Sequence, residues 1–142
     1  MVILHQLLME TIVLQDLDKD ILDVLSFALV QAGYIVHVTY VLDEHILESI
    51  ADVVPHIVLI DYKLSGKKAI ECCQWILSLY PNLPGIAMNC NSNIKDRYQA
   101  GGFDCYLDKP FDIEAMYLLI RKFVSYVSNN KVKSNKASFD SI

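Results

Sequence analysis

Four short apolar runs, each followed by a polar residue, constrain the fold of this chain more than any other feature. The runs are 12–15, 57–60, 85–88 and 105–108, and the residues that follow them are Asp16, Asp61, Asn89 and Lys109. Apolar runs of this length between turn signals predict strands buried on both faces, as in a parallel sheet. Open parallel sheets bind ligands beyond the carboxyl ends of their strands. The pattern therefore predicts that two carboxylates, an amide and an ammonium gather at one edge.

Size and charge fit a single domain with an acidic body. The chain has 142 residues, of which 54% are hydrophobic, so it can form one sizeable core and is not composed like a disordered protein. Its net charge is -5, and the basic residues of its tail are sparse. We therefore expect no nucleic-acid binding, which calls for a basic face. We expect an apolar extension over residues 1–9, one domain over 10–127 and a disordered polar tail over 128–142.

Neither secretion nor membrane insertion is expected. The first eight residues, MVILHQLL, lack a basic region and a cleavage site, and Glu10 interrupts the apolar run before it can span a membrane. These eight residues are either an N-terminal extension that comes from an early start codon or a short segment that packs on the edge of the domain. The cysteines show neither CxxC nor metal spacing, and the histidines show no ligand spacing, so we expect a reducing, cytoplasmic location. The cysteines are residues 72, 73, 90 and 105.

Strand and helix signals alternate along the chain. Asp18 or Asp20 can cap a first helix that ends at Gly33, Asp43 starts a second, and Asp112 caps the last. The expected strands are 11–14, 34–40, 56–61, 84–89 and about 103–107, and the other two helices are 68–79 and a weaker one at 91–99. Five strands alternating with five helices predict a doubly wound α/β fold with a parallel sheet.

Three segments, LQDLDKDIL, HIVLIDYKLSGKKAI and GGFDCYLDKPFD, resemble the receiver domain of two-component response regulators. The resemblance covers about residues 10–127. It implies a flavodoxin-like sheet of order 2-1-3-4-5, and a cis peptide bond between Lys109 and Pro110. It also implies a phosphoryl transfer from a histidine kinase or phosphotransfer protein to an aspartate that ends the third strand, in a signalling module that is not an enzyme.

The resemblance assigns roles residue by residue. Asp61 matches the phosphoacceptor, and Lys109 matches the lysine that pairs with the phosphoryl oxygens. Asp16 matches an acidic ligand of the Mg²⁺ site, which would also use Asp61 and the backbone carbonyl of Lys63. Tyr106 matches the aromatic switch residue. The chemistry is consistent, because an anionic nucleophile and an anionic phosphoryl group need a cation between them.

The chain departs from the family pattern at several positions. Leu17 stands where the family has a second acid, so the resemblance implies weak Mg²⁺ binding. Asn89 replaces the Ser or Thr that bonds the new phosphoryl group, and its amide could donate a similar bond. Ser65 replaces a proline in the loop after the acceptor. The stretch between Asn89 and Tyr106 is about two residues shorter than usual, which predicts a short fourth helix.

Two functions from different classes follow. In the first, the chain is a stand-alone phosphoacceptor that docks on a partner, or on a second copy, through the face formed by the helix at 91–99, strand 103–107 and the last helix. Asp61 and Lys109 favour it. In the second, the chain is a pseudo-receiver, an interaction module independent of phosphorylation, which Leu17 and Asn89 favour. A nucleotide-binding enzyme is disfavoured, since no glycine-rich phosphate loop follows any strand.

Overall fold

The computed structural model describes residues 9–40, 42–61, 67–89, 102–109 and 112–124. Within them lie five strands and four helices. The strands are β1 (Thr11–Gln15), β2 (Ile35–Thr39), β3 (Ile57–Asp61), β4 (Gly85–Asn89) and β5 (Cys105–Asp108). The helices are α2 (Lys19–Gln31), α3 (Glu44–Val53), α4 (Lys67–Leu79) and a helix over residues 113–124. The expected helix at 91–99, the tail at 128–142 and residues 1–8 fall outside the described residues.

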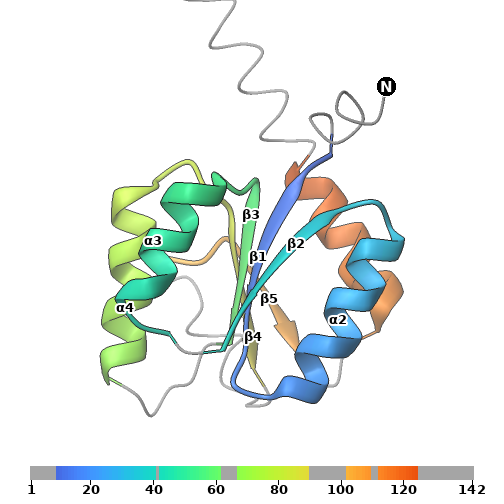
Figure 1. Cartoon of the computed structure of the whole chain (residues 1–142), viewed down its shortest axis with the longest axis horizontal. Coiled ribbons are helices and arrows are strands. Elements are labelled where there is room, and N and C mark those ends of the chain that lie inside the picture. The colour runs from blue at the N-terminus through green and yellow to red at the C-terminus, as the bar shows by residue number, and fades with distance from the viewer. Residues whose placement is uncertain (1–8, 41, 62–66, 90–101, 110–111, 125–142) are drawn as a thin grey trace, which may run out of the picture.

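All five strands are parallel and form one sheet in the order β2-β1-β3-β4-β5. The sheet order implied by the resemblance is thus confirmed. Figure 1 shows the sheet between two helical layers, with α3 and α4 on one face and α2 and the 113–124 helix on the other. This is the three-layer arrangement that alternating strands and helices predict.

Short polar side chains begin three of the helices, and Asp112 begins the 113–124 helix by accepting a hydrogen bond from the Glu114 amide at 3.0 Å, as predicted. The Asp18 carboxylate accepts hydrogen bonds from the backbone amides of Asp20 and Ile21, so Asp18, rather than Asp20, caps α2. Asp43 caps α3 by accepting a hydrogen bond from the amide of His45 at 3.0 Å. Such caps satisfy amides that have no partner within the helix. Gly33 follows α2 with a φ of +97°, a conformation that glycine adopts without strain.

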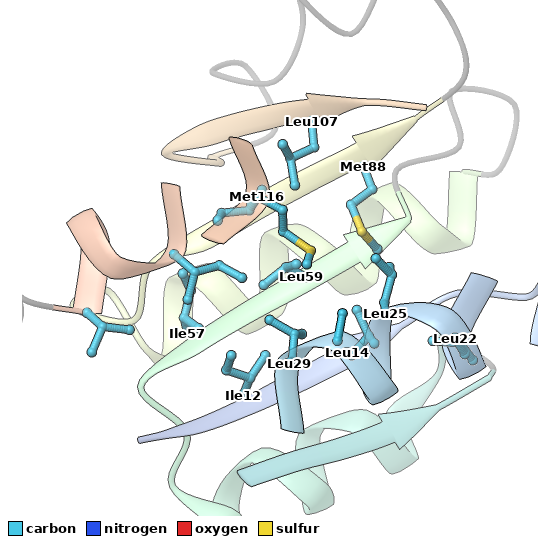
Figure 2. Packing of buried hydrophobic residues seen from close by; sticks show 14 residues of the cluster. Ile12, Leu14, Leu22, Leu25, Leu29, Ile57, Leu59, Met88, Leu107 and Met116 are labelled. Carbon is cyan, nitrogen blue, oxygen red and sulfur yellow. The ribbon is translucent and has the colours of Figure 1, made fainter. Parts of the chain in front are cut away.

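Each face of the sheet carries its own apolar core. Ile12 and Leu14 of β1 pack toward α2 and the 113–124 helix, as Figure 2 shows, whereas Val13 packs toward α3 and α4. All five residues of β3 are buried, as predicted for a central parallel strand. The edge strand β2 is half-buried or exposed along its length. The Tyr117 hydroxyl donates to the Ala28 carbonyl at 2.6 Å and ties the 113–124 helix to α2.

Strand β5 begins at Cys105, two residues later than the sequence predicts. Residue Asp104 explains the difference, because its backbone amide donates to the Gly85 carbonyl while its carboxylate accepts from the Gly85 amide, both at 2.9 Å. A side chain therefore takes the place of a strand-pairing bond at the start of β5. Phe103 is nevertheless buried, as a strand residue there would be.

The register brings the ends of the strands together at one edge. Gln15 lies beside Ile60, Asp61 beside Met88, and Asn89 beside Asp108. Parallel strands present their carboxyl ends at the same edge. The residues that end these strands, or directly follow them, are consequently neighbours.

Candidate functional site

A lysine joins two buried aspartates at this edge. Lys109 follows β5, and its ammonium donates a hydrogen bond to Oδ2 of Asp16 and lies 3.3 Å from Oδ1 of Asp61. The side chains of the three residues are 7%, 2% and 6% exposed, respectively. Buried charges are costly unless they are paired. The two carboxylates and the ammonium thus form one buried cluster with a net charge of -1.

The pKa of Lys109 reflects opposing effects. Burial by itself lowers the pKa of this ammonium, but the hydrogen bond to Asp16 and the negative charges of Asp61 and Asp16 outweigh it, and the pKa is raised above its ordinary value. Lys109 is therefore a fixed positive charge at neutral pH. It lies beside both carboxylates, where an ammonium can pair with anionic oxygens as a point charge.

Asp16 is held by its own turn. Its Oδ1 accepts a hydrogen bond from the Asp18 amide at 3.0 Å, and its backbone amide donates to the Thr39 carbonyl at 3.3 Å. One carboxylate oxygen is thus engaged by the turn and the other by Lys109. The next residue, Leu17, is 53% exposed. No carboxylate at position 17 adds to the site, because leucine stands there.

Gln15 is part of the site, although the sequence analysis did not select it. This side chain is 2% exposed. Its Oε1 accepts a hydrogen bond from the Asp61 amide at 3.1 Å, and its Nε2 donates to the Tyr40 carbonyl at 3.0 Å. The available signal was a polar residue at the last position of a fully apolar run, which is unusual for a strand buried on both faces.

The other predicted site residues are described in part. Asn89 ends β4 and pairs with Asp108 of β5, but its side chain lies outside the description. Tyr106 lies in β5, is half-buried and packs against the apolar core under α3 and α4. Lys63, Ser65 and Pro110, and with Pro110 the expected cis bond, lie outside the described residues.

The acidic residues suit a small oxygen-ligand site. Mg²⁺ keeps several waters and needs only one or two protein carboxylates. Asp16 and Asp61, which share the Lys109 ammonium, could supply those carboxylates. Among the described residues there is no group of three or more His, Cys, Asp or Glu side chains that could hold a metal ion. The two carboxylates suit a hard cation that keeps most of its water ligands.

Comparison with known proteins gives the family. No protein-family model matches the sequence. The transcriptional regulator NtrC of Escherichia coli K12 is 32% identical over 123 residues, which are 84% of this chain and 26% of NtrC. The regulator CreB of the same organism is 28% identical over 120 residues, or 83% of this chain and 52% of CreB. The chain is homologous to response regulator receiver domains. It spans about a quarter of NtrC and half of CreB.

Solved receiver domains share the fold. The BeF3-activated DrrB receiver domain superposes with a TM-score of 0.70 and 27% identity, and covers 83% of this chain and 99% of its own. A CheY-like receiver domain protein from Methanospirillum hungatei superposes with a TM-score of 0.76 and 22% identity, covering 86% and 98%. The receiver fold predicted from the sequence is confirmed. No helix within the described part of this receiver domain is long and apolar enough to cross a membrane.

Proposed function

We propose that this receiver domain accepts a phosphoryl group on Asp61 from a phosphohistidine of a histidine kinase or phosphotransfer protein in the cytoplasm. The observation that carries the proposal is the buried ammonium of Lys109, 3.3 Å from the Asp61 carboxylate and also bonded to Asp16. A carboxylate that meets a fixed cation in a nearly closed site can hold an anionic phosphoryl group beside it.

The transfer forms one bond and breaks one. An Asp61 carboxylate oxygen attacks phosphorus, the O–P bond of an acyl phosphate forms, and the P–N bond to the donor histidine breaks. The electron pair of that bond stays on the imidazole nitrogen, which keeps it as a lone pair or takes up a proton from solvent. Lys109 pairs with the phosphoryl oxygens as they approach.

Mg²⁺ belongs to the proposal, since receiver domains typically bind it at the phosphorylation site. When bound, it neutralises negative charge between the acceptor and the phosphoryl group. Asp16 and Asp61 would hold it, with the backbone carbonyl of Lys63 as a third contact. Leu17 supplies no carboxylate, so binding should be weak.

The output of the switch is assigned to a surface that includes β5. The amide of Asn89 would donate to the new phosphoryl group, and Tyr106 would change its packing in response. The receiver domain would then dock on a partner protein, or on a second copy, through the face formed by the helix expected at 91–99, β5 and the 113–124 helix. The position of Tyr106 supports this role, because the ring is half-buried in β5 and packs against the core under α3 and α4.

The alternative is a pseudo-receiver that binds partners without phosphorylation. Leu17 and Asn89 are the residues in its favour. The intact cluster of Asp16, Asp61 and Lys109 weighs against it, because an interaction module has no need to bury an unequal set of charges.

Intact-mass analysis tests the proposal. The chain is incubated with acetyl phosphate and Mg²⁺, and we expect one adduct of about 80 Da, the mass of one HPO₃ unit, that hydroxylamine removes as it removes acyl phosphates. Asp61→Asn should abolish the adduct. Asp52→Asn, which changes an exposed aspartate of α3, is the matched control and should leave the adduct unchanged. An adduct that persists in Asp61→Asn would assign phosphorylation to another residue, and no adduct on the native chain would favour the pseudo-receiver.

A further inference from the structure

One buried polar side chain contacts the phosphoacceptor but has no role in the chemistry described above. The buried polar or charged residues of the described part of the chain are Gln15, Asp16 and Asp61. Asp16 and Asp61 belong to the charged cluster. Gln15 is neutral, cannot accept a phosphoryl group and ends a strand whose other buried residues are apolar. A buried amide in such a place is tolerated only when its hydrogen bonds are made.

Both ends of the Gln15 amide are bonded, and the partners fix its orientation. The Asp61 amide can only donate, so the oxygen of Gln15 must face it; the Tyr40 carbonyl can only accept, so the nitrogen must face that atom. A carboxylate at this position has no hydrogen for Tyr40, and an apolar side chain can serve neither partner. The site therefore requires a group that donates and accepts about one glutamine length from the β1 backbone.

The bond to Asp61 lies just beyond the last residues that pair β1 with β3. The last register pair between β1 and β3 is Gln15 with Ile60. Asp61 follows Ile60, and its amide hydrogen goes to the side chain of Gln15. The backbone of the phosphoacceptor is thus held by a side chain of β1, while its own carboxylate lies 3.3 Å from the Lys109 ammonium.

We propose that Gln15 is a positioning residue for phosphoryl transfer, acting through the backbone amide of Asp61. The inference rests on the proposed function, since it concerns the same acceptor. Reacting atoms must lie about 3–3.5 Å apart and aligned, and a displacement of about 1 Å can cost on the order of 100-fold in rate. By fixing the Asp61 backbone relative to β1 and to the carbonyl that follows β2, Gln15 sets where the attacking oxygen lies.

The test compares Gln15→Met with the native chain in phosphorylation by acetyl phosphate and Mg²⁺. Methionine has a similar length and volume but cannot bond to either partner in this way. The rate at saturating acetyl phosphate should fall about tenfold while the half-saturating concentration changes less than about twofold, because the groups that meet the donor are unchanged. Urea unfolding of each variant shows that the reaction is run on folded protein, so lost stability cannot produce this pattern. Gln74→Met, at an exposed position of α4, is the control and should react as the native chain does.

Hydrogen exchange at the Asp61 amide supplies an independent readout. The amide should be protected in the native chain and exchange faster in Gln15→Met, whereas the Ile60 amide should not change. If Gln15→Met does not fold, Gln15→Asn carries the test, because this shorter amide cannot span both partners and should react at an intermediate rate.

The outcomes separate the two proposals. A native chain that is phosphorylated on Asp61, together with a Gln15→Met chain of equal maximal rate, overturns the role of Gln15 and leaves the proposed function intact. A slow variant whose defect lies wholly in the half-saturating concentration also overturns it. A native chain that takes no phosphate overturns both.

Discussion

At the scale of single residues, position 17 offers a direct test of the proposed Mg²⁺ site. Leu17 is 53% exposed and follows the buried Asp16, so an aspartate there can be added at little cost to the core. We expect Leu17→Asp to tighten Mg²⁺ binding by about 1–3 kcal/mol, because the new carboxylate would be a further anionic oxygen ligand for a dication. Calorimetric titration with Mg²⁺ measures the change directly.

A variant of the neighbouring Asp18 is needed to interpret equal Mg²⁺ affinities of the native chain and Leu17→Asp. Its Oδ1 accepts hydrogen bonds from two amides of α2 and is committed to that helix cap. Asp18→Ser keeps a capping oxygen and removes the charge, so it should leave Mg²⁺ affinity nearly unchanged. Equal affinities for the native chain and Leu17→Asp would mean that position 17 does not reach the ion, whereas a large loss in Asp18→Ser would show that Asp18 already does.

Some residues of the site could be predicted from the sequence and one could not. Asp16, Asp61 and Lys109 follow from a simple rule, because residues that end parallel strands meet at one edge of the sheet. Gln15 is the last residue of β1, one position before the first residue that this rule selects, and it acts through a backbone amide 46 residues away. No spacing rule gives a contact of that kind, since it depends on the register of two strands and on the rotamer of one side chain.

At the scale of elements, the end of α3 carries backbone strain. Val54 caps α3 with a φ of 51°, in the left-handed region, and its side chain is 68% exposed. A β-branched residue costs about 1–2 kcal/mol in this conformation, and little burial offsets that cost. We expect Val54→Gly to raise the free energy of unfolding by about 0.5–1 kcal/mol, after allowing for the larger chain entropy of glycine. Urea unfolding followed by circular dichroism measures it.

A second valine provides the control of opposite sign. Val24 lies within α2 with its side chain 57% exposed, and glycine there weakens a regular helix. Val24→Gly should therefore lower the free energy of unfolding by about 0.5 kcal/mol. If both substitutions destabilise the domain, the left-handed conformation at Val54 carries no relievable strain.

Element boundaries show where local patterns suffice. The apolar runs and the capping aspartates predicted β1, β3, β4, α2 and α3 to within a few residues. Both signals depend on a few consecutive residues, because a buried strand is a short apolar run and a helix cap is a single polar side chain. The start of β5 was wrong by two residues, since Asp104 uses its carboxylate to replace a strand-pairing bond with Gly85. Whether the Gly85 amide donates to a side chain or to a backbone carbonyl depends on how β4 and β5 pack together. The sequence around residue 104 does not contain that information.

At the scale of the whole molecule, the two apolar cores lie on opposite faces of one sheet, and one of them contains a buried thiol. Cys73 of α4 is fully buried in the core under α3 and α4, and burial, with lesser contributions from Cys72 and Asp61, raises its pKa from 9.0 to about 12. Because the folded chain keeps a proton that the unfolded chain releases, the free energy of unfolding should fall as the pH rises from about 9 toward 12. Between pH 8 and 10.5 this one group should account for about 2 kcal/mol of that fall. The ammonium of Lys109, whose pKa is also raised, adds its share only above its ordinary value of 10.5.

Removing the thiol isolates its contribution. Cys73→Ala leaves a small cavity, which lowers stability by a similar amount at every pH, but it abolishes the titration. Unfolding in urea with a reducing agent, repeated from pH 8 to 10.5, should give curves for the native chain and Cys73→Ala that converge by about 2 kcal/mol as the pH rises. The convergence of the two curves tests the packing of α3 and α4 on the sheet, because the pKa of Cys73 stays high only while β3, α3 and α4 keep water from that core. Parallel curves would mean that water reaches Cys73 in the folded state, and that the packing between the sheet and these two helices is looser than its burial indicates.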